Sequence, residues 1–224
     1  MNQQSPGAPS KRTRVRRLAE RAHYDQKTLY EIIDAAYLCN IAFNDGESTH
    51  CIPTACWRQE NYLYVHGSNG GRLTKVLTAG IQVSIAITHL DGLVLARSAF
   101  NHTMNYRSAV IYGTFEIVDG SQQKMAALDA FMDKIAAGRK HEARPGDANE
   151  LAATSVLRIS LAEAAAKINN TGPEDKPEDL DLPVWAGILP MSVKYGEPIQ
   201  SNADQHNSGD IPTPAYVQEW TNRS

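Results

Sequence analysis

The sequence of 224 residues has few cysteines, no long apolar run and no excess of positive charge. Its three cysteines, Cys39, Cys51 and Cys56, form no C-x-x-C pair and leave an odd number. No signal-peptide pattern precedes them, so reduced thiols in a cytoplasmic protein are the simplest interpretation. Their spacing to His50 and His66 fits no zinc-site pattern, and we expect no metal ion there. No apolar segment approaches the roughly 20 residues that a membrane-spanning helix needs.

The charge balance is slightly acidic, with a formal net charge of −3 at pH 7. This argues against a protein whose main role is to bind nucleic acid. The exception is the N-terminal region, where residues 1–16 are expected to form a disordered basic arm. Its basic residues and those just after it are Lys11, Arg12, Arg14, Arg16, Arg17 and Arg21. Because no aromatic residues alternate with them, we favour a solvated arm that pairs with acidic neighbours over a nucleic-acid or anionic-surface patch.

Hydrophobic periodicity predicts many short strands and few helices. Asp25 is a plausible N-cap for a helix over 28–36, whose residues Leu29, Ile32 and Ile33 form one apolar stripe. A second helix follows Arg72, and a third covers 122–137. Strands are expected at 37–43, 50–58, 62–66, 81–88, 93–97, 108–118 and 155–161, with an edge strand at 166–169. This order predicts a mainly β fold with flanking α-helices, in the form of a closed or split barrel.

The domain occupies residues 17–172, and the chain becomes irregular after it. Proline and acidic residues dominate from 173, which breaks regular structure. Trp185 lies in an apolar island within 173–197, and an exposed tryptophan there predicts packing on the barrel or on a second subunit. Residues 198–224 are predicted to form a flexible tail, in which Tyr216 and Trp220 are the anchors.

Two segments are rich in groups that bind ligands. His66 to Arg72 follows a strand and opens a helix, so its backbone N–H groups and the helix dipole favour an anion. Within it, Ser68 offers a hydroxyl and Arg72 a bidentate guanidinium. The second segment is Asn105-Tyr106-Arg107-Ser108, which suits a planar ring with hydrogen-bonding edges. Together they predict a phosphate site and a ring-binding site, although neither matches the P-loop or the dinucleotide fingerprint.

The order of these segments resembles the FMN-binding split-barrel proteins related to pyridoxamine 5′-phosphate oxidase, and most of all the nitroimidazole-resistance-type reductases. The similarity also includes Ile52 to Trp57, Leu90 to Ser98 and Leu182 to Pro190, and it covers about Arg17 to Pro190. It implies a homodimer with FMN at the subunit interface.

The resemblance also implies roles for individual residues. The FMN phosphate would be held by Ser68 and Arg72, with His66 and Lys75 as further candidates. For His66 the alternative is a strand-end histidine bonded to the backbone, and for Lys75 a solvated helix position. The residues that would run along the flavin ring are Pro53, Thr54, Ala55, Cys56 and Trp57.

Two of these roles have alternatives. Trp57 either stacks on the ring or fills the barrel. Pro53 within a strand predicts a sheet edge, where a ligand takes the place of a neighbouring strand.

The segment from Asn105 to Ser108 matches the ring-contacting part of the family. A positive Arg107 beside the ring would stabilise the anionic reduced flavin, and an ion pair across the dimer is the alternative role. The pyridoxamine-phosphate oxidases proper begin this strand with an Arg-Gln-Val-Arg-like sequence, which is missing here. This difference argues against vitamin B6 oxidation.

Three functions are compatible with the sequence. The first is an FMN-dependent oxidoreductase that reduces a small organic acceptor, such as a nitroaromatic, with NADH or NADPH as donor. The second is a flavin-binding sensor or regulatory module without turnover. The third is a haem-binding split barrel, for which His66 or His102 would be the axial ligand.

Overall fold

The structure is a computed structural model that describes residues 6–201 and 211–221. The disorder expected for residues 1–5 and the flexibility expected for 202–210 and 222–224 concern residues outside these ranges. The first half of the chain contains β1 (Ala22–His23), α1 (Gln26–Asp34), β2 (Leu38–Asn44), β3 (Thr49–Ala55), β4 (Trp57–Gln59), β5 (Tyr62–Ser68), α2 (Arg72–Thr78), β6 (Val83–Leu95) and β7 (Thr103–Gly113). The second half contains β8 (Glu116–Ile117), α3 (Ser121–Ile135), α4 (Ala148–Ala153), β9 (Thr154–Ser160), β10 (Ala164–Asn169), β11 (Gly187–Pro190) and α5 (Ala215–Thr221).

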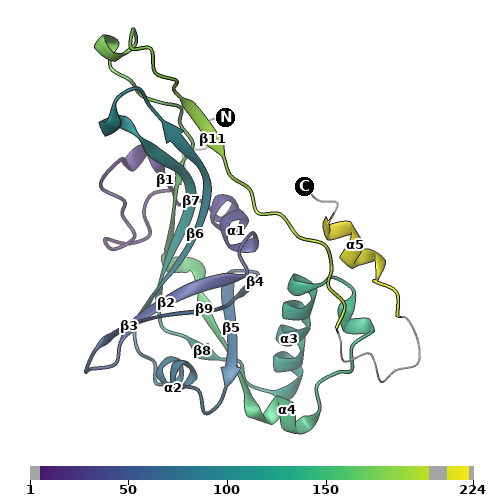
Figure 1. Ribbon diagram of the computed structural model, residues 1–224. Helices are drawn as coiled ribbons and strands as arrows, with labels where there is room; N and C mark the ends of the chain where they lie inside the picture. The colour runs from purple at the N-terminus through teal and green to yellow at the C-terminus, as the bar shows by residue number, and fades with distance from the viewer. Residues whose placement is uncertain (1–5, 202–210, 222–224) are drawn as a thin grey trace.

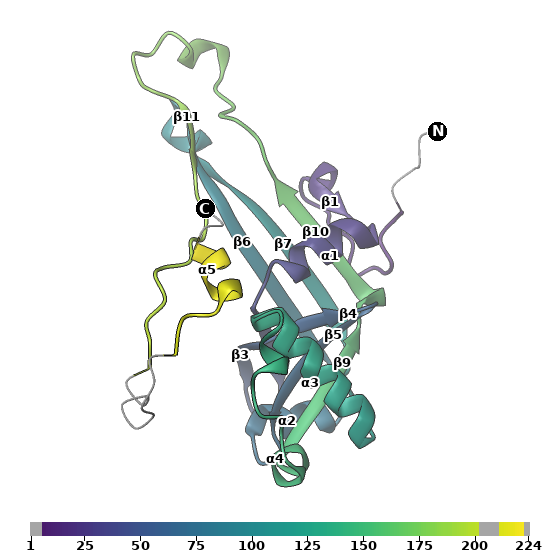
Figure 2. The ribbon, with the colours of Figure 1, turned by 90° about the vertical axis from the view of Figure 1, so that its right-hand side faces the viewer.

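The strands form two antiparallel sheets, as Figures 1 and 2 show. Sheet A has the order β1-β10-β7-β6-β2-β3, and β11 pairs with the far end of β6. Sheet B has the order β4-β5-β9-β8, and α3 lies along it. The large core cluster joins α1, sheet A and sheet B. This arrangement confirms the predicted mainly β split barrel with flanking helices.

Helix α1 has the predicted N-cap, but it begins at Gln26 and ends at Asp34, two residues earlier at each end than the expected range 28–36. The carboxylate of Asp25 accepts a hydrogen bond of 2.8 Å from the backbone N–H of Thr28, which satisfies one of the free donors at the helix start. Leu29, Ile32 and Ile33 are all buried. The apolar stripe therefore closes one side of the barrel.

Two predicted strands are each divided, because the chain passes there from one sheet to the other. The strand expected over 50–58 ends at Ala55, and β4 begins at Trp57 in sheet B. The strand expected over 108–118 ends at Gly113 and is followed only by the short β8. Gly113 has a φ of +155°, and a Cβ there would lie 3.3 Å from Cδ1 of Ile159.

The strands expected over 81–88 and 93–97 are instead one long strand, β6. A register shift between Leu90 and Gly92 places an extra residue, Asp91, in β6, so the chain passes this point as a β-bulge and not as a turn. The strand expected at an edge, β10, is covered in turn by β1. A two-residue strand such as β1 is too short to be recognised from periodicity.

Part of the predicted disordered arm packs on the barrel. Thr13 is buried, Arg12 forms an ion pair of 2.5 Å with Glu163, and the backbone N–H of Val15 donates to the hydroxyl of Tyr24. The expected pairing with acidic neighbours explains this order. The predicted tail also contains structure, since Trp220 of α5 stacks on Tyr195.

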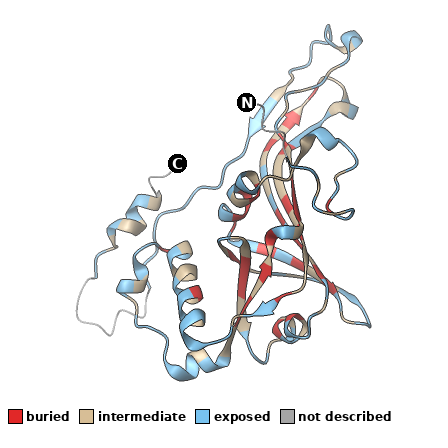
Figure 3. Cartoon of the chain, turned by 180° about the vertical axis from the view of Figure 1, so that it is seen from behind, coloured by how far each residue is buried: buried red, intermediate tan, exposed pale blue. Residues whose placement is uncertain are grey.

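Burial is concentrated in the barrel, whereas the β6–β7 end and the chain after β11 are largely exposed (Figure 3). In residues 6–201 and 211–221, no helix combines the length and the apolar character needed to cross a membrane.

Candidate functional site

His66 lies between β5 and α3, in contact with two aromatic side chains. Its ring centroid is 4.6 Å from that of Phe131 and 5.8 Å from that of Trp57. The alternation of β5 turns Tyr64 and His66 toward α3, while Leu63 and Val65 enter the core. A polar ring is thereby held between two large apolar ones.

The imidazole of His66 has an unusual electrostatic state. Burial lowers the pKa of His66 below its ordinary value of 6.5, because the surroundings disfavour the charged form. Its Nδ1 is buried and has no hydrogen-bond partner in the described part of the chain, and the same holds for Nε1 of Trp57. A neutral imidazole with free ring nitrogens is a potential metal ligand. The backbone-bonded alternative for His66 is not what the structure shows.

Trp57 fills space within the barrel wall. It is 1% exposed, and its ring stacks on Tyr64 with a centroid distance of 5.7 Å. Phe131 covers another side at 4.9 Å. This burial supports the barrel-filling role for Trp57.

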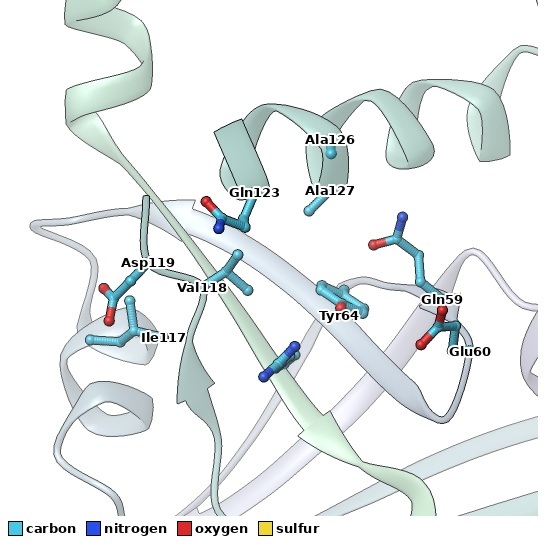
Figure 4. A pocket seen from close by; sticks show the side chains of 10 residues that line it. Gln59, Glu60, Tyr64, Ile117, Val118, Asp119, Gln123, Ala126 and Ala127 are labelled. Atoms are coloured by element: carbon cyan, nitrogen blue, oxygen red, sulfur yellow. The ribbon is translucent and has the colours of Figure 1, made fainter. Parts of the chain in front are cut away.

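A groove of about 600 Å³ lies on the other side of Tyr64, between α3 and sheet B (Figure 4). Gln59 and Tyr64 line it from the sheet, and Gln123 and Ala127 line it from the helix. Its only cationic lining side chain, Arg158, is bound to Glu116 at 3.2 Å.

The predicted phosphate segment lies at one end of sheet A. Nη2 of Arg72 is 2.6 Å from Oδ2 of Asp45 and 2.6 Å from Nε2 of His50. The hydrogen bond from the Ser48 backbone and the contact with Arg72 lower the pKa of Asp45, so this carboxylate is firmly ionised. Arg72 is nevertheless 59% exposed and keeps donors free for a ligand.

The other two residues of this segment are more open. Ser68 ends β5, Lys75 lies on α2, and both residues are exposed. Neither side chain takes part in an ion pair among the described residues.

The side chains of the predicted ring-binding segment, Asn105 to Ser108, point alternately to the two faces of β7. Asn105 is buried, and its Nδ2 donates to the carbonyl of Thr171 at 3.1 Å. Arg107 forms a bidentate pair with Asp91, at 2.9 and 2.8 Å, which raises the pKa of Arg107. The predicted ion pair of Arg107 thus exists, but within one chain. Tyr106 and Ser108 alternate with these residues onto the outer face.

The outer face of sheet A is the surface turned away from the core. Pro53, Asn40, Ala86 and Val110 form one row across β3, β2, β6 and β7. Pro53 and Ala55 share this face with Tyr106 and Ser108, while Thr54 and Cys56 turn inward. The row spans about 14 Å, because neighbouring strands lie about 4.8 Å apart. Pro53 is on an edge strand of the described sheet, as predicted.

Trp185 lies at the opposite end of sheet A from Arg72. Its side chain is over Gly187, where a Cβ would be 2.6 Å from Cζ2 of the indole. Gly187 pairs with Leu95 at one end of β6, whereas Phe43 beside the Asp45 turn pairs with Val83 at the other. At about 3.4 Å per residue, these ends are roughly 40 Å apart. One chain therefore does not bring the phosphate segment and Trp185 together.

Several residues of the site were not predicted. Asp45, His50, Asp91 and Phe131 were not among the predicted site residues. Each of these residues contacts another side chain of the site that the fold brings close to it. A carboxylate in a turn carries no sequence signal for such a partner.

The sequence matches the pyridoxamine 5′-phosphate oxidase family over residues 25–168. The chain belongs to this family. No curated protein matches it. It is similar to the flavocytochrome Anf3 from Azotobacter vinelandii, with 35% identity, coverage of 96% of this chain and 99% of that one, and a TM-score of 0.89.

Two further structures are similar. The FAD and haem binding protein from Mycobacterium smegmatis is 30% identical, over 90% of this chain and 97% of that one, with a TM-score of 0.84. A protein assigned to 5-nitroimidazole antibiotic resistance in Bacteroides thetaiotaomicron is 20% identical, over 66% and 86%, with a TM-score of 0.56. The last similarity supports the fold.

Proposed function

We propose that this protein is a homodimeric redox protein that binds both a flavin and a haem. The observation that carries the proposal is His66, whose pKa is lowered by burial and whose buried Nδ1 has no hydrogen-bond partner among the described residues, in a chain similar over nearly its full length to a flavocytochrome. The proposal therefore combines two of the functions that are compatible with the sequence, the flavin-dependent oxidoreductase and the haem-binding split barrel. A bound flavin can transfer one or two electrons, and a bound haem transfers one. Together the two groups would link two-electron and one-electron steps.

The surroundings of His66 are more apolar than those of His102, which makes His66 the better candidate for an iron ligand. His102 is exposed, and its Nδ1 lies 3.0 Å from the carbonyl of Ser98. His66 is instead half-buried beside Trp57 and Phe131, which exclude water and provide the apolar surroundings that a porphyrin needs. In this proposal His66 binds the iron, and the two aromatic rings shield it.

The outer face of sheet A fits the ring system of a flavin. An edge strand such as β3 presents backbone N–H and C=O groups without ladder partners, which match the alternating edge of the pyrimidine half. Tyr106 and Ser108 lie on the same face. Arg72 and Ser68 supply donors for a phosphate.

A second copy explains why these elements are separated in one chain. The ring-binding residues and Trp185 of one copy would then meet the phosphate segment of the other. The apolar side chains exposed around β11 support this arrangement, and they include Leu182, Val184, Trp185, Ile188, Leu189 and Val193. A C2 dimer would cover them.

The absorption spectrum of the purified full-length protein tests the proposal. We expect flavin bands in the blue and near-ultraviolet together with a Soret band. Flavin bands alone would leave the oxidoreductase and the regulatory module and exclude the haem. Neither chromophore after reconstitution with haem and flavin would overturn the proposal.

Arg72→Ala is expected to weaken flavin binding by about 10- to 100-fold. The variant loses a charge-assisted hydrogen bond to the phosphate, for which roughly 1.5–3 kcal/mol is typical. Titration with the flavin, followed by its fluorescence, measures the change. Lys75→Ala is the control on the same helix, and we expect a smaller effect. Unchanged affinity in Arg72→Ala would remove Arg72 from the site.

Trp185→Ala is expected to weaken the dimer. An aromatic residue at the centre of an interface commonly contributes about 2 kcal/mol or more, which corresponds to roughly 30-fold in the dissociation constant. Sedimentation over a range of concentrations measures it. Trp220→Ala is the control, since Trp220 stacks on Tyr195 of its own chain. A monomeric wild-type protein that holds flavin tightly would contradict the shared site.

A further inference from the structure

Two segments of opposite charge lie on either side of the region that matches the oxidase family, residues 25–168. The basic segment, residues 10–17, has Lys11 and four arginines and no acidic residue. The acidic segment, residues 174–181, has five carboxylates and one lysine. The matched barrel is therefore flanked by one positive and one negative stretch of chain.

The basic segment is held firmly on the barrel. Thr13 is 3% exposed, and the guanidinium of Arg12 lies over the ring of Tyr112 at 5.2 Å. Nζ of Lys167 donates to the backbone carbonyl of Arg17 at 3.1 Å. The backbone of the segment is thus fixed at both ends on β7 and β10.

Most of the positive charge of this segment is not neutralised. Lys11, Arg14, Arg16 and Arg17 are exposed and take part in none of the ion pairs found in residues 6–201 and 211–221. Because the backbone is already ordered, little conformational freedom is lost when an anionic partner binds.

The acidic segment is fixed at the tip of the β6–β7 hairpin. The carboxylate of Asp175 is 3% exposed and accepts hydrogen bonds from the backbone N–H of Arg97 at 2.7 Å and from its Nη1 at 2.9 Å. Nδ2 of Asn101 donates to the carbonyl of Glu174 at 2.8 Å. The side chains of Glu174 and Asp181 are exposed and form no ion pair among the described residues.

The two segments are too far apart to neutralise each other within one chain. The basic segment contacts Tyr112, and the acidic segment lies beyond Thr103 at the other end of β7 (Figure 1). These two residues are roughly 30 Å apart at about 3.4 Å per residue. Salt screens exposed charges beyond roughly 10 Å at an ionic strength of about 0.1 M. Each segment therefore needs a partner outside its own chain.

Opposite charges at the two ends of one strand pair are self-complementary. A twofold axis that places two hairpins antiparallel brings each positive end to the negative end of the other copy. The acidic segment is also continuous with the exposed apolar residues proposed for the dimer, which begin at Leu182. At the other end, Arg14 and Lys167 line a cavity of about 240 Å³ together with Ser108 of the ring-binding segment.

We propose that the basic segment of each copy binds the acidic segment of a second copy, in two equivalent contacts of an antiparallel dimer. Arg14, Arg16 and Arg17 of one copy face Glu174 and Asp181 of the other. The acidic segment of one copy thereby closes the cavity beside Ser108 of its partner. The inference rests on the homodimer of the proposed function.

Reversal of charge in either segment tests the contact. One variant combines Arg16→Glu with Arg17→Glu, and another combines Glu174→Lys with Asp181→Lys. Sedimentation of the full-length proteins over a range of concentrations gives the dissociation constant of each dimer. At about 50 mM NaCl we expect each variant to dimerise at least about tenfold more weakly than the wild type, because like charges then meet in both contacts. Raising the salt to about 500 mM should weaken the wild-type dimer and reduce these differences.

The variant that carries all four substitutions is the decisive one. Its charges are exchanged between the segments, so the contacts are again complementary, and we expect a dissociation constant close to that of the wild type. Dimerisation that stays weak in this variant would overturn the contact.

Asp119→Lys with Asp129→Lys is the matched control. Both residues are exposed near α3 and form no ion pair in the described part of the chain, and their reversal changes the net charge by the same amount as the acidic variant. We expect the control to dimerise like the wild type. A wild-type dimer that neither salt nor the reversals weaken, or a control as weak as the acidic variant, would overturn this inference and leave the homodimer intact. A wild-type protein that is monomeric at both salt concentrations would overturn the proposed homodimer and this inference with it.

Discussion

Replacing His66 with alanine is expected to remove the haem while the barrel and the flavin remain. The substitution deletes the proposed iron ligand, and even groups that only support a metal ligand contribute roughly 10- to 100-fold to affinity. We therefore expect haem affinity to fall by at least about 100-fold. The Soret absorbance per protomer after reconstitution with haem measures this loss, and the flavin bands of the same sample report the remaining site.

His102→Ala is the control for this experiment. His102 is exposed at the end of the β6–β7 hairpin and is expected to leave the spectrum unchanged. Added imidazole should restore a His66→Ala spectrum close to that of the wild type, because it supplies the missing nitrogen. If His102→Ala loses the haem and His66→Ala keeps it, the assignment of the ligand is wrong.

Replacing Trp57 with alanine is expected to cost about 3–5 kcal/mol of unfolding free energy, the usual range for a buried tryptophan. Trp57 is 1% exposed and packs on Tyr64, Phe131 and His66. For a chain of this size the loss corresponds to a fall in Tm of roughly 6–20 °C. Thermal unfolding followed by circular dichroism measures it, and we expect haem binding to weaken as well.

Trp57→Phe separates packing from hydrogen bonding. Nε1 of Trp57 has no partner in the described residues, so phenylalanine loses part of the volume and no hydrogen bond. Its destabilisation should be much smaller than that of Trp57→Ala. The alternative role, stacking on a flavin ring, would show the opposite result: an unchanged Tm and a loss of flavin in Trp57→Ala.

Local patterns were sufficient to predict much of the fold. The cap at Asp25, the apolar stripe of α1 and the edge position of Pro53 each follow from a physical preference of one residue or a short repeat. The strand expected over 108–118 was correct up to Gly113, but the change of sheet at that residue was not predicted. A glycine shows that the backbone is unusual and does not show which sheet the chain enters next.

Contacts between distant segments account for the differences. Arg72 was predicted to hold a phosphate together with Ser68, yet its guanidinium is joined to Asp45 and His50, because β2 and β3 return past α2. Arg107 meets Asp91 only through the bulge in β6. The sequence also offers His66 and His102 as haem ligands without distinguishing them. Burial in the folded chain is what favours His66, and its role stays a prediction.

The contacts of the chain from β11 onward indicate the order in which the barrel and this C-terminal segment fold. β11 pairs with β6, and the hydroxyl of Tyr195 reaches that of Tyr37 at 2.6 Å, so these contacts join residues far apart in the sequence. Such long-range pairing forms slowly, and the N-terminal part of a chain leaves the ribosome first. The barrel therefore folds while its C-terminal covering is still unattached.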